Sequence, residues 1–434
     1  MDYEAFLRDF YRLERFGIKL GLDVIADLLC RLGDPQKRFP AVHVTGTNGK
    51  GSVCAMVESV LRAAGYRTGL YTSPHLVRFN ERIRVEGHEI ANADVMRLYD
   101  SILPHMQKMA AASPVDHPTF FEATTAMAFQ YFDERKVDIA VVEVGMGGRY
   151  DATNTVEPAV SVVTRVDLEH AEHLGRTVRR IAREKSGIIK EGRPAVTVDQ
   201  EAIGEIEARC AQTRSALTVV GRDVRFVRLG STLEGQRIEV RNGHRHELGI
   251  ALLGKYQGEN AALAFAAIEA LRRTGWKVSD EQLLRGFREA RWPARFQVVR
   301  RDPLVIVDSG HNPPAVKALA ESFQELLPGR QAHLVFGAMA DKELDAMAGS
   351  LLPLAQRLTF VRAGIERAQG AEQLRTVFEQ AALRTGLPLP PVTVSPDVGS
   401  AVKAALAGLA PSDILMVAGS VYVAGEALEA LGAG

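Results

Sequence analysis

VHVTGTNGKGS, residues 42–52, is an apolar strand pattern that runs into a glycine-rich turn and then into a helix. Glycines let backbone N–H groups turn inward around phosphate oxygens, and the amino end of the next helix adds the positive end of its dipole. Lys50 supplies a full positive charge at the same turn. We expect this stretch to bind the phosphates of a nucleotide; the alternative is a glycine-rich turn that binds nothing. The helix is predicted by apolar residues that recur every three or four positions, at Val53, Met56, Val57, Val60 and Leu61.

The loop departs from the general phosphate-loop pattern G-x-x-x-x-G-K-[ST] at one position. Gly51 follows Lys50 where serine or threonine is expected, and Ser52 comes one place later. Whether Ser52 takes the usual role of this serine toward magnesium is therefore open. We predict that the phosphate contacts of the nucleotide come from Thr47, Asn48, Gly49, Lys50, Gly51 and Ser52.

Apolar runs along the chain predict two α/β domains. Between residues 39 and 192 short apolar runs alternate with helical patterns, which is typical of a parallel sheet with crossover helices. Residues 217–253 show alternating strands with turn signals, which predict one or two antiparallel hairpins at the edge of this domain. From Leu304 onward, five apolar runs separated by amphipathic segments predict a smaller, Rossmann-like, doubly wound domain.

A break in the helical pattern at Arg291-Trp292-Pro293 predicts the boundary between the two domains. We therefore expect a phosphate-loop domain over residues 1–296 and a second α/β domain over residues 297–434. Two domains joined in this way could close on each other.

The composition provides enough apolar material for more than one core, since 46% of the 434 residues are hydrophobic. Lysine plus arginine and aspartate plus glutamate both number 53, so the zero net charge offers no general attraction for nucleic acid or an anionic membrane. Three cysteines, an acidic N-terminus and the lack of about 18 consecutive apolar residues predict a cytoplasmic protein that does not enter a membrane. The neutral charge and two complete domains favour a monomer.

Two further strand ends place polar side chains beside the expected phosphate loop. Glu143 lies near the end of the apolar strand 138–144, and His170 follows the strand 159–164 at the same edge of the sheet. A carboxylate there could hold Mg²⁺ directly or through water, and the alternative is a solvated side chain. The histidine is also compatible with a structural role. Glycines in 145–149 indicate a loop that a ligand approaches closely, or one that is merely flexible.

Lys185 lies on the apolar face of a predicted helix, which it shares with Val178, Ile181 and Ile188. A lysine in such a place is costly unless it snorkels to water, is paired with an acid, or is chemically modified. The pattern leaves these three alternatives open.

Two strand-to-helix turns of the second domain also carry polar groups. The turn D-S-G-H-N-P at 308–313 has aspartate, histidine and asparagine side chains that could bind polar groups of a ligand. The turn G-S-V-Y at 419–422 could present backbone amides and a hydroxyl to a carboxylate. Capping turns use the same residue types, so a structural role is the alternative for both.

In this order, these segments resemble the folylpolyglutamate synthase/dihydrofolate synthase family, which is related to the Mur peptide-bond ligases. The similarity extends over most of the chain, and the run Lys50-Gly51-Ser52 looks like this family's own variant of the phosphate loop. The matching segments are T-G-T-N-G-K-G-S at 45–52, Y-T-S-P-H-L at 71–76, N-E-R-I at 80–83, T-F-F-E at 119–122, E-V-G-M-G-G-R at 143–149, D-A-T-N at 151–154, E-K-S-G-I at 184–188, Gln257 with Asn260, W-P-A-R-F at 292–296, D-S-G-H-N-P at 308–313 and G-S-V-Y at 419–422.

The resemblance implies an ATP-dependent ligase. A pteroate or folate carboxylate would take the γ-phosphoryl group of ATP, and the amino group of L-glutamate would attack the resulting acyl phosphate and release phosphate. Two Mg²⁺ ions are implied, one on Ser73 and Glu143 and a second on His170, with a carbamate on Lys185 that helps to organise it. Lys50, Lys185 and His170 would then be the catalytic residues.

The resemblance also implies contacts from the domain junction and from the second domain. The nucleotide would be contacted there by Asn260, Arg295 and Asp308. We expect His311 and Ser420 to recognise glutamate, and Phe120 and Phe121 to lie at the pterin end of the acceptor. The chain departs from the family pattern without losing these groups, since Glu169-His170 stands for the usual Asp-His, Ala294 for a glycine, and Ser309-Gly310 for Gly-Ala.

Two alternatives come from different classes of protein. A Mur ligase that acts on a UDP-linked precursor would normally carry a large N-terminal domain, whereas only 44 residues precede Thr45 here. A nucleotide-dependent switch or binding module would not explain the turns at 308–313 and 419–422. Within the ligase interpretation, addition of the first glutamate and extension of folates both remain open.

Overall fold

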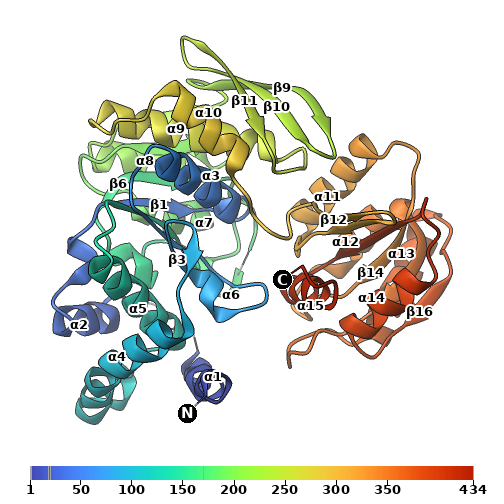
Figure 1. The fold of residues 1–434 in the computed structure, drawn as a ribbon, viewed down its shortest axis with the longest axis horizontal. Helices are drawn as coiled ribbons and strands as arrows, with labels where there is room; N and C mark the ends of the chain where they lie inside the picture. Colours follow the sequence, from blue (N-terminus) through green and yellow to red (C-terminus); the bar gives the residue numbers. More distant parts are fainter. Residues whose placement is uncertain (1, 18, 20, 170, 434) are drawn as a thin grey trace.

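The computed structural model describes residues 2–17, 19, 21–169 and 171–433, which are built around two large sheets (Figure 1). The first sheet has eight strands in the order β4-β3-β2-β5-β1-β6-β7-β8. The run from β2 to β8 in this order is parallel, and β3 and β4 add an antiparallel edge. The bounds are β1 Ala41–Thr45, β2 Thr68–Tyr71, β3 Ile83–Val85, β4 His88–Glu89, β5 Ile139–Glu143, β6 Pro158–Val163, β7 Ala195–Val198 and β8 Leu217–Val220.

The register of this sheet brings the carboxyl ends of its three central strands together. Val44 of β1 lies opposite Glu143 of β5, and Thr45 lies opposite Val163 of β6. The central strands β1 and β5 are buried along their whole length, which is why they read as continuous apolar runs. The loops that begin at Gly46, Val144 and Thr164 therefore leave the sheet side by side.

Helices cover both faces of the first sheet. One apolar core joins the sheet to α3, α9 and α10, and a second joins its other face to α1, α2, α4 and α5. The bounds are α1 Tyr3–Tyr11, α2 Asp23–Arg31, α3 Lys50–Ala63, α4 Asn92–Ala112, α5 Phe120–Glu134, α6 Ala171–Leu174, α7 Val178–Lys185, α8 Ile203–Gln212, α9 Gln257–Arg273 and α10 Asp280–Glu289. In the part of the chain that is described, no helix combines the length and the apolar character needed to cross a bilayer.

The prediction for residues 217–253 is wrong in one detail. The first apolar run forms β8 of the parallel sheet, and only β9 (Arg225–Thr232), β10 (Gly235–Arg241) and β11 (Arg245–Ile250) form antiparallel hairpins. These three strands make a separate sheet, because Ile238, Val240 and Leu248 bury one face with the apolar residues of α9. Alternation of apolar and polar residues shows that a strand has one buried face, but it does not show which sheet the strand joins.

The second large sheet has six strands in the order β12-β13-β17-β14-β15-β16. All five predicted apolar runs form its parallel strands, and β12 pairs with β13 as an antiparallel edge that the polar sequence did not reveal. The bounds are β12 Gln297–Arg301, β13 Leu304–Val307, β14 Ala332–Phe336, β15 Ala355–Phe360, β16 Val392–Val394, β17 Ile414–Ala418, α11 Pro313–Leu326, α12 Leu344–Leu351, α13 Ala371–Thr385, α14 Val398–Ala407 and α15 Val421–Ala430. The predicted α/β class is confirmed, and the structure adds an antiparallel edge to the parallel strands of each sheet.

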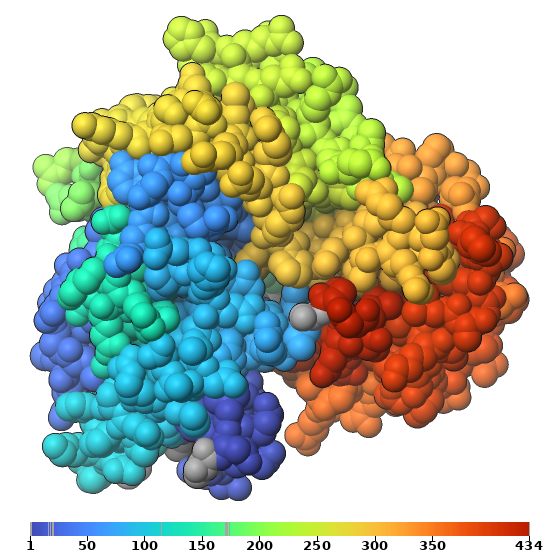
Figure 2. All heavy atoms as spheres, viewed as in Figure 1, coloured from blue at the N-terminus to red at the C-terminus, as the bar shows by residue number. Residues whose placement is uncertain are grey.

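Contacts join the two halves at several places. In the space-filling view the later part of the chain, orange to red, forms a lobe against the rest of the molecule (Figure 2). Arg228 of β9 donates to Glu325 of α11, and Leu76 packs against the apolar core beneath α15. The division into 1–296 and 297–434 stays a prediction, which the start of β12 at Gln297 supports.

Candidate active site

The phosphate loop connects β1 to α3, which begins at Lys50. Gly49 has a φ of 92°, and a Cβ there would lie 2.3 Å from Oδ1 of Asn260. Gly51 accounts for the departure from the general loop pattern, because a Cβ at this position would lie 2.6 Å from Nε1 of Trp292. Both glycines are therefore required by close approach of residues far along the chain.

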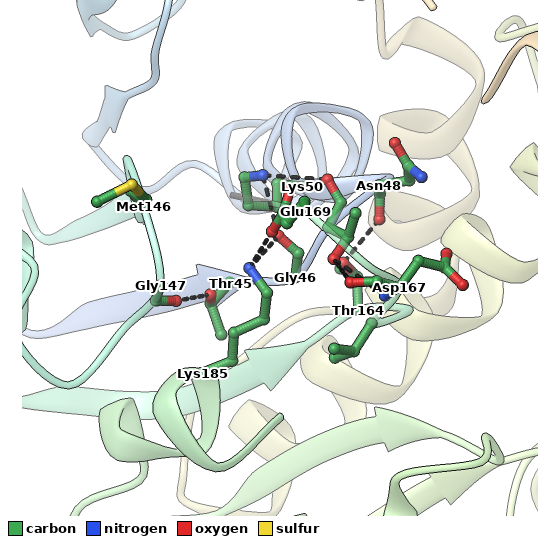
Figure 3. Close-up of polar contacts among 12 residues, drawn as sticks. Thr45, Gly46, Asn48, Lys50, Met146, Gly147, Thr164, Asp167, Glu169 and Lys185 are labelled. Atoms are coloured by element: carbon green, nitrogen blue, oxygen red, sulfur yellow. Dashed lines mark hydrogen bonds and ion pairs between the residues drawn. The ribbon is translucent and has the colours of Figure 1, made fainter. Parts of the chain in front are cut away.

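Two lysines converge on one carbonyl group of this loop. Nζ of Lys50 donates to the carbonyl oxygens of Gly46 and Thr47, at 3.0 and 3.3 Å, and Nζ of Lys185 donates to the same Gly46 oxygen at 2.8 Å (Figure 3). The side chain of Lys185 is only 1% exposed and lies 2.5 Å from Oε1 of Glu169. Of the three alternatives for Lys185, snorkelling is excluded and pairing is observed. Burial lowers the pKa of Lys185 to about 8, against the opposing charge of Glu169.

The remainder of the loop is tied to the end of β6. The Thr47 hydroxyl donates to the carbonyl of Asp167 and accepts from its N–H, at 3.1 and 3.0 Å. The Thr164 hydroxyl donates to the carbonyl of Asn48 at 2.7 Å. These bonds fix the backbone of the loop, so the Thr47 side chain holds the loop itself in shape.

Glu143 lies at the end of β5, directly beside the loop. It is buried, and one of its carboxylate oxygens accepts from the backbone N–H of Ser73 at 3.3 Å. Burial raises the pKa of Glu143, while the charge of Lys50, the Ser73 N–H and the charges of Arg295 and Arg82 oppose the rise. Among the residues that the structure describes, no ion pair within 4 Å involves this carboxylate, so it is available to a cation.

The predicted metal ligands are brought together in part. Ser73 and Glu143 are neighbours, whereas His170 lies outside the described residues. Within the described chain, no three histidine, cysteine, aspartate or glutamate side chains are placed to bind a metal by themselves. A metal at Glu143 would therefore complete its coordination with hydroxyl, water or phosphate oxygens, which are the donors that Mg²⁺ prefers.

The domain junction contributes Arg295, and the second lobe contributes Asp308, near the same loop. Both carboxylate oxygens of Asp308 are engaged, by the N–H groups of Phe296 at 2.8 Å and Gly310 at 2.7 Å. Burial raises the pKa of Asp308, and the charge of Arg295 opposes this. The guanidinium of Arg295 donates to the Ser309 hydroxyl. Asp308 thus stabilises the backbone of this turn, and Arg295 binds the Ser309 side chain of the same turn.

An amide pair joins the loop directly to the second lobe. Nδ2 of Asn312 donates to Oδ1 of Asn48 at 3.1 Å, and the reverse bond measures 3.4 Å. Asn312 also caps α11 through the N–H of Ala315. The turn at 308–313 is therefore both a helix cap and a contact to the phosphate loop.

The residues predicted to bind substrate occupy different environments. Phe120 is buried in an aromatic cluster with Phe10, whereas Phe121 is half-buried and packs directly over Gly145. Nδ1 of His311 lies 3.1 Å from the carbonyl of Ser309, and burial lowers the pKa of His311 to about 4. The Ser420 hydroxyl accepts from the N–H of Val423 and caps α15. Phe121 thus contacts the loop that follows β5.

Gln257 is a buried residue of the site, and its position in the sequence did not predict a role for it. Its Nε2 donates to the Ser52 hydroxyl at 3.1 Å, and its Oε1 accepts from Nδ2 of Asn260 at 2.9 Å. The signal was the glutamine and asparagine three positions apart at the start of a helix, which places them on one face. Ser52 is therefore held by α9.

Replacing Gln257 with methionine should lower the free energy of unfolding by about 2 kcal/mol, because Ser52 and Asn260 lose a buried partner. Urea-induced unfolding measures this change. Gln331→Met is the matched control, since Gln331 is exposed, and should change the free energy by less than about 0.5 kcal/mol. Equal effects of the two substitutions would show that the Gln257 network does not stabilise the site.

Comparison with known proteins identifies the family. The model of the Mur ligase middle domain matches residues 44–268, and that of the Mur ligase glutamate ligase domain matches residues 294–421. The dihydrofolate synthase/folylpolyglutamate synthase of Bacillus subtilis is 34% identical over 94% of both chains. The chain belongs to the folylpolyglutamate synthase/dihydrofolate synthase family of the Mur ligase superfamily. The resemblance inferred from its motifs is confirmed.

Other relatives in this family differ in length and in what they bind. A probable bifunctional folylpolyglutamate synthase/dihydropteroate synthase of Halobacterium salinarum is 39% identical over 98% of this chain, which spans only about half of that relative. The structure of Escherichia coli FolC in complex with DHPP and ADP is 30% identical, with a TM-score of 0.87 over 100% of this chain and 98% of that one. The Mycobacterium tuberculosis folylpolyglutamate synthase complexed with ADP and AMPPCP has a TM-score of 0.89.

Proposed function

We propose that this chain is an ATP-dependent ligase that joins L-glutamate to the carboxylate of dihydropteroate, of glutamylated folates, or of both. The observation that carries this proposal is the convergence of Lys50 and Lys185 on the Gly46 carbonyl, beside the buried carboxylate of Glu143. Membership of the family supports the choice of substrates, as does the DHPP and ADP bound by the Escherichia coli relative.

In the proposed reaction, an acceptor carboxylate oxygen attacks the γ-phosphorus of ATP and ADP leaves. The amino nitrogen of L-glutamate then attacks the carbonyl carbon of the acyl phosphate, phosphate leaves, and the nitrogen loses a proton. Lys50 would stabilise the charge on the transferring phosphoryl group, because a fixed cation in a partly buried site costs no reorganisation. The loop N–H groups from Thr47 to Ser52 would hold the remaining phosphate oxygens.

Glu143 and Ser73 fit a magnesium ion, because Glu143 offers a buried carboxylate that no ion pair among the described residues engages, and Ser73, whose backbone N–H donates to it, carries a hydroxyl. His170 is proposed as a ligand of a second ion. Bound Mg²⁺ would neutralise phosphate charge during the transfer. Asn260, Arg295 and Asp308 are proposed to position the nucleotide between the lobes, and His311 and Ser420 to position the glutamate. Closure of the lobes would exclude water, which otherwise hydrolyses an acyl phosphate.

Lys185 fits a carbamate, because its lowered pKa leaves a larger share of the neutral amine that reacts with CO₂. In that step the nitrogen forms a bond to the carbon of CO₂ and releases one proton. The product is an anion, so the Glu169 carboxylate, now 2.5 Å from Nζ, would turn away or share a cation with it. The carbamate would convert a buried cation into a ligand for metal.

Phosphate release from Mg-ATP by the purified protein tests the proposal. L-Glutamate is combined with 7,8-dihydropteroate, with tetrahydrofolate or with a UDP-linked precursor, and each component is left out in turn. Release that needs both glutamate and a pteroate-type acceptor is expected, and the preferred acceptor identifies the step. Release that depends on neither would favour a nucleotide switch, and release that depends on a UDP-linked acceptor would favour a Mur-type ligase.

The proposed enzyme is a cytoplasmic monomer that uses small-molecule substrates and neither nucleic acid nor a membrane. The zero net charge supports this, because it provides no general attraction for polyanions. Light scattering coupled to size-exclusion chromatography tests the monomer, and a mass of about twice 47.3 kDa would contradict it.

A further inference from the structure

A short segment that follows β2, residues 73–78, contacts both lobes, and we call it the docking segment. At its start, the N–H of Ser73 donates to the carboxylate of Glu143 at 3.3 Å. Further along, Leu76 and Val77 pack against the apolar core of the second lobe, although they belong to the earlier part of the chain. The docking segment therefore connects the proposed magnesium site to the second lobe.

The first lobe holds the backbone of the docking segment. The carboxylate of Glu81 accepts from three consecutive N–H groups, those of residues 76–78, at 2.8, 2.9 and 2.7 Å. Nε of Arg82 donates to Nδ1 of His75 at 2.8 Å. Hydrogen bonds to a carboxylate are about twice as strong as those between neutral groups, so residues 76–78 are held in one conformation. A displacement at Leu76 is therefore expected to reach Ser73, three residues away.

Helix α15 of the second lobe meets the docking segment at a glycine. Gly425 is buried, and a Cβ at this position would lie 2.0 Å from the carbonyl oxygen of Leu76 and 2.8 Å from its carbonyl carbon. In Figure 1, α15 lies on the side of the second lobe that faces the first. Glycine inside a helix is destabilising relative to alanine, so its presence here needs a reason. The close approach of the Leu76 backbone supplies that reason, because a backbone carbonyl cannot rotate away as a flexible side chain would.

The same helix begins at the turn that is proposed to position the glutamate. The Ser420 hydroxyl caps α15 by accepting from the N–H of Val423 at 3.1 Å. Gly425 lies in the second turn of this helix. The position of α15 therefore determines both where Ser420 lies and how closely the second lobe fits against the docking segment.

We propose that Gly425 is a positioning residue for the reaction, because it lets α15 seat against the docking segment and so keeps Ser73 in place. The inference rests on the proposed function, in which Ser73 and Glu143 hold a magnesium ion. Through this one contact, the lobe that is proposed to bring the glutamate also completes the site of phosphoryl transfer. The acyl phosphate would then form only when the second lobe is seated, which limits its loss to water.

Gly425→Ala in the full chain tests this inference. The added methyl group would force α15 and the docking segment about 1 Å apart, since Cβ atoms do not lie within 3.0 Å of another heavy atom. The kcat for phosphate release should fall by at least about thirtyfold, because a displacement of about 1 Å at a reacting site can cost about a hundredfold. Gly349→Ala is the matched control, because Gly349 lies inside α12 of the same lobe and a Cβ there meets nothing within 4 Å. The control gains the same helix propensity and should keep kcat within about twofold.

Hydrogen exchange at single-residue resolution gives a readout that does not depend on activity. In Gly425→Ala, the amide of Ser73 should exchange at least about tenfold faster, because its bond to Glu143 is the longest of those that hold the docking segment. The amides of residues 76–78 should keep their protection, since Glu81 holds them. The amides of β14 and β15 should exchange as in the unchanged protein.

A second substitution acts on the same contact from the other side. Leu76→Ala removes an apolar side chain that packs against the second lobe and should lower kcat by at least about fivefold. The double variant Leu76→Ala/Gly425→Ala should lie within about twofold of Gly425→Ala alone, because both changes disrupt one contact.

Several outcomes would overturn the inference. Gly425→Ala could keep the rate of the Gly349→Ala control, exchange at Ser73 could stay unchanged, or the losses of the two single variants could multiply in the double variant. Faster exchange throughout β14 and β15 would show that the substitution unfolds the second lobe, which also contradicts a positioning role. Failure of the proposed function looks different, because the unchanged protein would then release no phosphate in response to any acceptor, while exchange at Ser73 would still report the docking contact.

Discussion

Lys50→Ala is expected to abolish ligation, with kcat reduced by at least about a thousandfold, while the fold stays intact. In the structure Nζ of Lys50 contacts only carbonyl oxygens of its own loop, so its removal breaks no ion pair among the described residues. The substitution should remove stabilisation of the transition state for phosphoryl transfer, to which a preorganised cation in a protected site contributes several kcal/mol. Steady-state phosphate release with both substrates measures this effect.

Two controls separate this effect from misfolding. Urea-induced unfolding of Lys50→Ala should match that of the unchanged protein to within about 1 kcal/mol. Lys37→Ala removes a lysine whose ion pair with Asp34 is on the surface, and it should leave the rate unchanged. Full turnover by Lys50→Ala would show that the phosphate loop takes no part in the reaction.

Lys185→Ala is expected to lower kcat by at least about a hundredfold, and added acetate or another short carboxylate should restore part of it. The small carboxylate would occupy the space of the proposed carbamate and supply the missing anion. Lys185→Arg is the matched variant, because it retains the cation that faces Glu169 but cannot become a neutral amine near pH 8. Full activity of Lys185→Arg would show that the cation, and not a carbamate, is required.

The amount of carbamate on Lys185 is expected to depend on pH. With a pKa of about 8, roughly one Lys185 side chain in ten is a neutral amine at pH 7, and most are neutral at pH 9. The carbamate signal in ¹³C NMR with labelled bicarbonate should therefore increase as the pH rises from 7 to 9. Lys185→Arg should show no such signal. An equal signal at both pH values would show that the amine of Lys185 does not titrate between pH 7 and 9, which contradicts a pKa of about 8.

The phosphate loop and the strand order around it could be predicted because they depend on local patterns. The β1–α3 unit is marked by an apolar run, spaced glycines and a helical period, and each points to the same geometry. Glu143 was placed correctly beside the loop because carboxyl ends of parallel strands meet at one edge. The burial of Lys185 followed from its position on an apolar helix face.

The partners of these groups could not be predicted in the same way. Glu169 lies on a loop with no periodic pattern, so nothing in the sequence placed it 2.5 Å from Lys185. Trp292 lies 241 positions after Gly51 (292 − 51), and their contact depends on how α3 and the domain junction pack. The separate sheet of β9, β10 and β11 was missed for a related reason, since its buried face is filled by a helix.

The amide pair between Asn48 and Asn312 links the phosphate loop to the second lobe. Binding of a nucleotide to the loop and the orientation of the lobe are therefore expected to be coupled. A nucleotide that favours one arrangement of the loop also favours the lobe orientation that preserves the pair, and linkage requires the converse. A substrate that binds only to the second lobe and restrains it should change the affinity for ATP by some factor. ATP should then change the affinity for that substrate by the same factor.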